Sequence, residues 1–414
     1  AEDRAEADSI DVPNQCLVPF GSTSFLPYLA TVDSRIPSLI SSCNTKRLSR
    51  LNVPFQMPKN NNVAEGHNLT VTWDIDPKLT FRSITGYRKV DTRNNVLYTG
   101  FGPGSDPYLI RSDGLPTTFV GGATPFDGRN HQWVVYNESW SQEFQLLGDL
   151  NQNFKYTTGL YYSTEKGHQR QGPGIFFTVP DALFLAGAGP VGVDMATLEQ
   201  RALKAKNSTW AVFGQVSWTP DILDHKLEIV PGIRFTKDHR RAVGTNLRGE
   251  QYFYTATGTP GVNNLLFSVP NPAAYANVVG DNDFSKTTPA LSLNYHWNKD
   301  VMTYVKASKG YVTGGFDDQQ STAAGFAKGF KPETITSYEL GLKGEFLDRR
   351  LRLNGAVFDS KYDNEQKTVV HAGNVWAIEN VGTSKYKGVE LDVTALLTDS
   401  FRVSAAATWL DHKY

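Results

Sequence analysis

Alternation of apolar and polar residues at every second position is the feature that most limits what this chain can fold into. The stretch KGVELDVTALLTDSFRVSAAATW, residues 387–409, shows the alternation twice. Val389 and Leu391 alternate with Glu390 and Asp392, and the pattern resumes after a Thr-Asp-Ser turn. A period of two sustained over about nine to eleven residues is the signal of a strand with two different faces. Two such runs joined by a short turn predict a β-hairpin.

The same pattern recurs along most of the chain, each time as two runs around a turn rich in Asn, Asp or Pro. The six predicted hairpins span residues 67–88, 137–166, 209–240, 286–313, 333–363 and 384–413. Helical periodicity is almost absent, and ATLEQRALKAKN, residues 195–206, is the best short helix candidate. The fold class predicted is therefore all-β, with about twelve antiparallel strands.

The lengths of the connections distinguish between all-β architectures. Turns within hairpins have a few residues, whereas the segments between hairpins, 89–136, 167–208 and 241–285 above all, are long. Because the long segments recur at every second connection, they must all emerge at one end of the sheet. Short turns at one end and long loops at the other are typical of a transmembrane β-barrel, whose tilted strands need about 9–11 residues to cross. A soluble β-sandwich, the alternative, gives no reason for this asymmetry.

In a barrel the apolar positions face lipid and the polar positions face a wet interior. Val389 and Leu391 are expected on lipid, and Glu390, Asp392 and Arg402 in the lumen. Aromatic residues that suit an interfacial girdle lie beside the short turns, although packing at the edge of a core is also open. These residues are Trp73, Phe81, Trp218, Trp297, Phe346 and Phe401. No window approaches eighteen uninterrupted apolar residues, so the sequence predicts no membrane-spanning helix.

The two cysteines, Cys16 and Cys43, flank a polar segment that contains proline. Neither has a Cys-x-x-Cys partner for zinc, so two readings remain: a loop disulfide or two unrelated buried thiols. Their placement favours the disulfide, which implies an oxidising compartment. The formal net charge of -1 gives no argument for a nucleic-acid partner.

Motifs that carry catalytic chemistry are missing from the sequence. It has no G-x-S-x-G elbow, no Walker loop and no His-Glu-x-x-His, and its eight histidines are scattered. We therefore expect no enzyme activity, no cofactor and no metal site. Calcium could bind at residues 281–283 or at Asp317 and Asp318, but carboxylates in solvated turns are the favoured reading.

Candidate ligand contacts follow from position rather than from a motif. Arg82, Arg88 and Arg234 share the wet faces of two strands and could attract an anionic chelate, or could pair across the lumen with Glu339, Glu345 or Asp392. Pairing of these arginines with the carboxylates is favoured over attraction of a ligand. The run Tyr252, Phe253 and Tyr254, in a long outer loop, could stack on a ligand or pack the loop against its neighbours.

Three segments together resemble the barrel of TonB-dependent outer-membrane receptors: SKGYVTGGFDDQQ (308–320), FKPETITSYELGLKGEFLDRRLRLNGAVFDSKYDNEQ (330–366) and IENVGTSKYKGVELDVTALLTDSFRVSAAATWLDHKY (378–414). LTFRSITGYRKVDT (79–92) and residues 141–167 are also similar, and the order of the segments is that of the family. The resemblance covers about residues 67–414 and leaves 1–66 as an expected long extracellular loop region. It implies periplasmic short turns, extracellular long loops and a bacterial outer-membrane location.

The resemblance also implies a function and partners. Such a receptor imports a scarce nutrient, such as an iron–siderophore chelate, with energy from the inner-membrane TonB–ExbB–ExbD complex, and is surrounded by outer-membrane lipid. A full barrel of this family is expected to have about 22 strands, a plug domain and a TonB box. The sequence shows about twelve strands and neither a plug domain nor a TonB box. The chain is therefore expected to be the middle of a receptor. A non-energised barrel, such as a passive porin or a surface adhesin, is the alternative.

Overall fold

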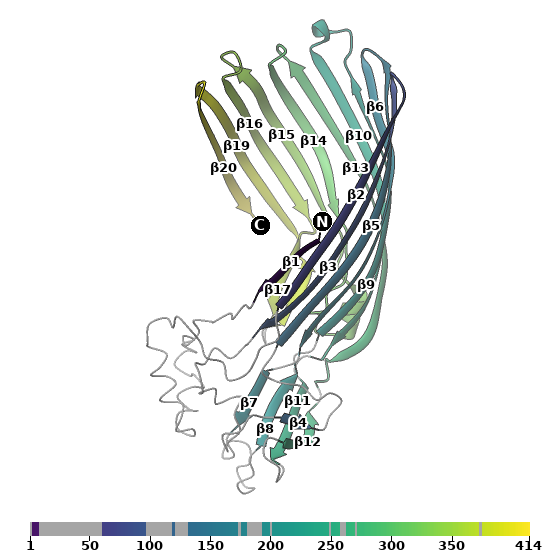
Figure 1. Ribbon diagram of the computed structural model, residues 1–414, viewed down its shortest axis with the longest axis vertical. Coiled ribbons are helices and arrows are strands. Elements are labelled where there is room, and N and C mark those ends of the chain that lie inside the picture. The colour runs from purple at the N-terminus through teal and green to yellow at the C-terminus, as the bar shows by residue number, and fades with distance from the viewer. Residues whose placement is uncertain are drawn as a thin grey trace.

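Long antiparallel strands form one curved sheet in which almost every strand is hydrogen-bonded to the next long strand along the chain (Figure 1). The computed structural model describes residues 2–7, 60–96, 118–120, 131–172, 175–179, 193–198, 201–247, 250–256, 262–269, 271–371 and 375–414. Within these residues the sheet has 13 strands. They are β1 (Glu2–Ala7), β2 (Asn60–Asp76), β3 (Leu79–Val96), β5 (His131–Asn151), β6 (Phe154–Gly172), β9 (Arg201–Trp218), β10 (Leu227–Asn246), β13 (Tyr275–His296), β14 (Val301–Val312), β15 (Glu333–Phe346), β16 (Leu351–Asp363), β19 (Thr383–Thr398) and β20 (Phe401–Lys413).

The twelve long strands from β2 to β20 pair as six hairpins, and most extend beyond the ranges that alternation predicts. The hairpin expected at 67–88 occupies Asn60–Asp76 and Leu79–Val96 in the structure. β1 pairs with the first residues of β2, from Glu2 opposite Glu65 to Ala7 opposite Asn60. The structure does not describe residues 8–59, so the assignment of 1–66 as an extracellular loop region stays a prediction.

Three of the short turns at one end of the sheet share the same local hydrogen bond. A side chain at the end of the first strand accepts from the backbone N–H two residues later: Asp76 from Lys78 at 2.7 Å, Asn151 from Asn153 at 2.8 Å and Asn298 from Asp300 at 2.9 Å. This Asx geometry closes a turn without any contribution from the rest of the protein. We call this end of the sheet the short-turn end; in the β9–β10 turn it carries the short 3-10 helix η1 (Leu223–His225).

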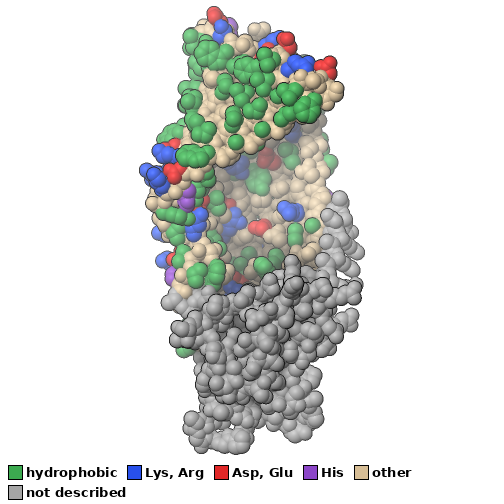
Figure 2. Space-filling view, turned by 90° about the vertical axis from the view of Figure 1, so that its left-hand side faces the viewer, with side chains coloured by type: hydrophobic (Ala, Val, Ile, Leu, Met, Phe, Trp, Pro, Cys, Tyr) green, Lys and Arg blue, Asp and Glu red, His purple; other side chains and the backbone are tan. Residues whose placement is uncertain are grey.

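The two faces of the sheet differ as the alternation predicts. On β19, Val389 and Leu391 are exposed on the convex face, and Leu391 keeps 44% of its surface. Glu390 lies on the opposite, concave face, in a hollow shared with Tyr304 and Glu339. Figure 2 shows hydrophobic side chains gathered toward the short-turn end and charged side chains inside the hollow of the molecule. Among the described helices, none has the length and apolar character that crossing a membrane requires.

The long connections at the other end contain further strands. β4 (Thr118–Val120), β7 (Ile175–Val179), β8 (Val193–Leu198), β11 (Glu250–Ala256) and β12 (Val262–Val269) form a five-stranded sheet, and β17 (Gln366–His371) pairs with β18 (Val375–Asn380). The helix predicted at 195–206 is wrong, because residues 195–198 lie in β8 and residues 201–206 lie in β9. Hydrogen bonding of β9 to both β6 and β10 overrides the helix propensity of its Ala, Leu and Lys residues.

A cap, made of residues 313–332 and the β17–β18 hairpin, folds onto the concave face of β10 and β13. It contains the short helix α4 (Ala323–Lys328), whose Phe326 is 0% exposed. A Cβ on Gly244 would lie 2.3 Å from the Phe326 ring, and one on Gly280 would lie 2.3 Å from Phe316. The two glycines therefore let the aromatic rings of the cap approach the backbone of the wall. Ala242 and Tyr275 complete this small buried core.

Candidate functional site on the concave face

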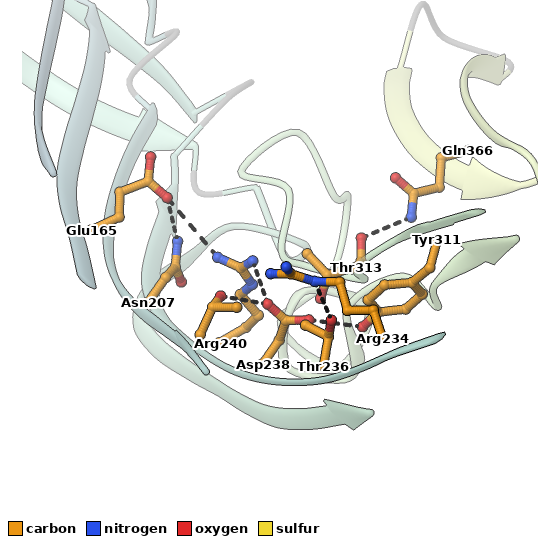
Figure 3. Close-up of polar contacts among 10 residues, drawn as sticks. Glu165, Asn207, Arg234, Thr236, Asp238, Arg240, Tyr311, Thr313 and Gln366 are labelled. Atoms are coloured by element: carbon orange, nitrogen blue, oxygen red, sulfur yellow. Dashed lines mark hydrogen bonds and ion pairs between the residues drawn. The ribbon is translucent and has the colours of Figure 1, made fainter. Parts of the chain in front are cut away.

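Polar side chains from three neighbouring strands meet on the concave face beneath the cap (Figure 3). Glu165 of β6 and Arg240 of β10 flank Asn207 of β9, because Asn207 is paired directly with both. Asn207 Nδ2 donates to Glu165 Oε2 at 3.1 Å, and Arg240 Nη1 lies 4.0 Å from the same oxygen. Asn137 of β5 donates to the other Glu165 oxygen at 2.6 Å. The carboxylate of Glu165 thus joins four strands.

Asp238 is the most deeply buried member of this network, with 3% of its surface exposed. Its Oδ1 accepts hydrogen bonds from Thr209 at 2.5 Å and from Arg240 Nη2 at 3.0 Å, and its Oδ2 accepts from the Tyr311 hydroxyl at 3.0 Å. A buried carboxylate with three donors, one of them charged, is satisfied where it lies. It therefore fixes the positions of Arg240 and Tyr311 rather than offering a free charge to the lumen.

Arg234 differs from Arg240 because it has an open side. Its Nε donates to Thr236 at 3.2 Å, and its guanidinium lies 5.3 Å from the ring centre of Tyr161 and 5.5 Å from that of Phe213. Such cation–π contacts hold the side chain without neutralising it. In the described part of the chain, Arg234 forms no ion pair, so its positive charge is available to a ligand in the hollow.

The cap brings buried carboxylates to the rim of this site. Asp317 accepts from the backbone N–H groups of Gln319 at 3.0 Å and Ile378 at 2.8 Å, which joins the two halves of the cap. Asp318 is 4% exposed, and burial raises its pKa to about 6, against the opposing attraction of Arg201. Burial also raises the pKa of Asp317. The favoured reading of these residues as a solvated turn is wrong, since the cap closes over them.

Residues 281–283 likewise lie in a strand rather than in a loop. Asp281 contacts Arg241 at 2.8 Å and Asp283 contacts His239 at 3.0 Å on the convex face of β10 and β13. Among the described residues, no group of three or more His, Cys, Asp or Glu side chains is placed to hold a metal ion.

The three arginines singled out from the sequence lie on the concave face but are not brought together. Arg82 and Arg88 belong to β3, and β5, β6 and β9 separate that strand from Arg234 on β10. Arg82 donates to Gln145 at 3.5 Å, and Arg88 lines a hollow of about 550 Å³ beside Gly66 and Ser139.

The carboxylates that could have paired with these arginines have other partners. Glu339 accepts a hydrogen bond from Tyr304, and Asp392 accepts one from Asn354 at 3.4 Å. Glu345 pairs with Arg352 at 3.1 Å and with Arg349 at 3.4 Å. Glu339, Glu345 and Asp392 therefore do not form ion pairs with Arg82, Arg88 or Arg234.

The remaining residues singled out from the sequence are harder to place. Tyr252, Phe253 and Tyr254 lie on β11, a strand within the β10–β13 connection that pairs with β8 and β12. Cys16 and Cys43 lie outside the described residues, so their disulfide stays a prediction.

Sequence reasoning missed Glu165, Asn207, Asp238, Arg240 and Tyr311. The signal was present in part, because alternation puts the first four of them on the wet faces of their strands, whereas Tyr311 has the parity of Val305, which is 53% exposed. Their meeting depends on the registers of β6, β9 and β10, which place Asp238 opposite Thr209 and Arg240 opposite Asn207. A register depends on the length and geometry of the turn that joins two strands, and alternation within one strand does not determine it.

A comparison with protein families matches residues 21–414 to the family described as TonB dependent receptor-like, beta-barrel. The chain belongs to the TonB-dependent receptor family. This membership places the chain in the bacterial outer membrane, with its short turns in the periplasm and its long loops outside the cell. The convex face of the sheet therefore faces lipid, and the concave face is the luminal face.

Relatives in the family include receptors for metal chelates. The chain is 27% identical over 147 residues to "Probable TonB-dependent siderophore receptor PiuA" of Acinetobacter baumannii, a match covering 35% of this chain and 19% of that protein. It is 30% identical over 126 residues to the "Metal-pseudopaline receptor CntO" of Pseudomonas aeruginosa, which covers 30% of this chain and 16% of that receptor.

Solved structures show the same fold. The ferric yersiniabactin uptake receptor FyuA from Yersinia pestis aligns with a TM-score of 0.56 at 15% identity, over 86% of this chain and 43% of FyuA. The copper transporter OprC aligns with a TM-score of 0.53 at 12% identity, over 86% of this chain and 47% of OprC. The chain therefore spans about half the length of these TonB-dependent receptor structures.

Proposed function

We propose that this chain forms part of the wall of a receptor that imports a scarce nutrient, such as a metal chelate, across the outer membrane. The observation that supports it most is the family match over residues 21–414, because this barrel belongs to receptors and transporters. Two relatives are named as receptors for a siderophore and for metal-pseudopaline. On this proposal the protein is not an enzyme, and its partners are membrane lipid, a small ligand and the TonB–ExbB–ExbD complex.

Anionic chelates fit the luminal face better than neutral ligands do. Arg234 presents a cation held by two aromatic rings and by Thr236, with no carboxylate paired to it among the described residues. Arg82 and Arg88 add two further cations on β3. We propose that these three arginines attract the ligand along the wall, and that Tyr252, Phe253 and Tyr254 contact it earlier, from the extracellular side.

Uptake of iron-55 by cells that express the full-length receptor, in a strain lacking its other siderophore receptors, tests the proposal. The probes are ferric complexes of catecholate, hydroxamate and carboxylate chelators, each with and without a protonophore. Import should require the proton motive force for at least one of these probes. Uptake that persists with the protonophore, or that follows the concentration gradient for all three, would support the passive barrel instead.

Substitution of Arg234 tests the ligand assignment separately. Arg234→Gln should lower uptake of an anionic ferric chelate by about tenfold, the size expected for losing one charge-assisted hydrogen bond. Arg349→Gln, in an exposed periplasmic turn, is the matched control and should leave uptake unchanged. Equal uptake by both variants would remove Arg234 from the ligand path while leaving import itself intact.

A further inference from the structure

The ladder that joins β13 to β14 stops partway up the sheet. β13 is paired with β10 along almost its whole length, whereas its pairing with β14 covers only Ala290–His296. The next residue, Pro289, has no N–H to give to a neighbouring strand. β14 continues past this point in register with β15, up to Val312. Residues 285–289 therefore form an edge beside which the described part of the chain places no strand, and we call this edge the seam.

The end of β14 turns toward the lumen instead of following the edge of β13. Tyr311 has the parity of Val305, which is exposed on the convex face, yet its hydroxyl donates to the luminal Asp238 at 3.0 Å (Figure 3). This hydrogen bond crosses over β13, because Asp238 lies on β10 and is paired there with Phe284. In the cap, a Cβ on Gly314 would lie 2.6 Å from the Phe284 ring. The chain therefore passes over the luminal face of β13 and leaves its edge free.

The cap holds β13 only above the seam. Asn282 donates to the backbone oxygen of Lys328 at 3.1 Å, and Gly280 and Phe284 lie beside cap residues. Within the residues that the structure describes, no hydrogen bond or ion pair joins residues 285–289 to the cap or to β14. Backbone without a partner is tolerated at membrane depth only where it lines a wet cavity. The seam is therefore continuous with the water of the lumen.

Aromatic residues give the level of the seam in the membrane. Trp297, 57% exposed beside a short turn, marks the periplasmic side of the apolar band. From there the seven residues of β13 that pair with β14, tilted by about 40°, rise by roughly 18 Å, and the band is about 25 Å tall. Trp210 and Phe235, whose rings lie 5.4 Å apart, mark the other side, and Phe235 is paired with Thr287 in the seam. The seam therefore lies at the level of the outer leaflet.

Two luminal cations lie at the foot of the seam. Arg234 is paired with Thr288, whose hydroxyl donates to the Arg234 backbone oxygen at 3.4 Å. Lys286 lies two residues away on the same face, opposite Thr236, and is half-buried. Neither cation forms an ion pair with a carboxylate among the described residues. An anion bound between Arg234 and Lys286 would thus lie within a few residues of lipid.

We propose that the ligand of this receptor is an anionic metal chelate that carries a hydrocarbon tail, and that the seam is the passage for the tail. Arg234 and Lys286 bind the chelate in the lumen, and the tail extends between β13 and β14 into the outer leaflet. There it stays in hydrocarbon while the charged end stays in water. This ligand class rests on the proposed function, because it specifies which chelates the receptor imports.

Binding to the full-length receptor in lipid nanodiscs tests the passage. The probes are an anionic ferric dihydroxamate–citrate chelate with a dodecanoyl tail and the same chelate with an acetyl group instead. Thr287→Trp fills the lipid side of the seam and should weaken binding of the tailed probe at least about tenfold, but binding of the acetyl probe by less than about twofold. Ala307→Trp, on the same face of β14 but paired with strands on both sides, is the matched control and should change neither.

Two further measurements locate the charged end and the tail. Lys286→Gln should weaken both probes by about tenfold, the size expected for one charge-assisted hydrogen bond. A tailed probe with a diazirine in the middle of its chain should label residues 285–291 and 305–311 of the unsubstituted receptor on illumination. Partition of each probe into empty nanodiscs is subtracted, and heat-modifiable gel mobility confirms that the variants are folded.

The possible results separate this ligand class from the proposed function. Equal effects of Thr287→Trp on the two probes, or photolabelling that spares both segments, would overturn the passage. Equal binding of the two probes with the expected loss in Lys286→Gln would keep an anionic ligand and remove its tail. Binding of neither probe would overturn the anionic chelate itself, and with it the tail.

Discussion

Asp238 shows how a single luminal residue can be structural although it lies on a polar face. Its carboxylate takes three hydrogen bonds and is almost completely buried among β9, β10 and β14. Removing one partner of a buried charged pair leaves the other uncompensated. The role of this residue is therefore to position Arg240 and to join three strands.

Asp238→Ala should lower the free energy of unfolding by about 3–5 kcal/mol, because Arg240 loses its closest counter-ion and Tyr311 and Thr209 lose their acceptor. The measurement is urea-induced unfolding in detergent micelles, followed by heat-modifiable gel mobility. Asp359→Ala, which breaks an ion pair on the exposed convex face, is the matched control and should leave the midpoint unchanged. Equal midpoints for both variants would contradict a structural role for Asp238.

Asp318 makes the docking of the cap depend on pH. Burial raises its pKa from 3.8 to about 6, so the docked cap favours the protonated acid more than an open cap does. Docking should be strongest below about pH 4, weaken as the pH rises to about 6, and stay constant above that. The free energy that favours the docked cap should fall by at most about 3 kcal/mol over this range. Hydrogen exchange of the amides in residues 313–332, corrected for intrinsic rates, measures this change.

Asp318→Asn removes this titration and should reduce the pH dependence of cap opening between pH 4 and 7, leaving the part that comes from Asp317. A pH profile identical in the variant and the unsubstituted protein would show that another group causes the change.

At the scale of the element, alternation identifies strands well where one side meets lipid and poorly elsewhere. The pairing of the six hairpins follows from it, because an apolar stripe and a short turn determine where each strand turns back. β13 begins at Tyr275, well before the predicted start at 286. The prediction missed its first residues because charged side chains on the convex face, such as Asp281 and Asp283, interrupt the apolar alternation there. Outside the lipid both faces are wet, and the pattern that marks a strand is lost.

The cap could not be predicted for a different reason. Its burial depends on Gly244 and Gly280, which lie on strands distant in sequence from Phe326 and Phe316. A pattern of local residues contains no sign of such a contact.

Gly244→Ala should displace the cap, because its new Cβ would lie 2.3 Å from the Phe326 ring. Hydrogen exchange in residues 313–332 should become faster, while the exchange of β10 itself stays slow. Gly232→Ala on the same strand meets no atom closer than 3.7 Å and is the control. Unchanged protection of the cap in the Gly244 variant would show that Phe326 does not pack there in solution.

The two faces of β19 give a sharper test of orientation. Leu391→Arg places a charge on the lipid face near the middle of the membrane and should cost about 2–4 kcal/mol, which reduces the amount of folded barrel. Glu390→Arg changes the luminal face and should cost much less. Folded fractions on heat-modifiable gels compare the two, and equal losses would mean that the face assignment is wrong.

For the whole molecule, family membership predicts which end of the sheet can be reached from outside the cell. Cysteine placed at Ser321 in the cap should react with a membrane-impermeant maleimide on intact cells, whereas cysteine at Asp348 in a short turn should react only after the outer membrane is opened. The native Cys16 and Cys43 should stay unlabelled until they are reduced, as their predicted disulfide requires. Labelling of Asp348→Cys on intact cells would reverse the orientation.

The strict two-sidedness of the long strands also has a consequence for how such a gene can change. Losing or gaining one residue within β9 would shift every later side chain of the strand to the other face of the sheet. Trp210 would exchange its face with Ala211, and Asn207, the partner of Glu165, would exchange its face with Ser208. Lipid-facing side chains would then turn inward and luminal ones outward. A change of two residues would keep every side chain on its own face. Length variation among natural relatives should therefore gather in the extracellular loops, and where it enters a strand it should come in pairs of codons.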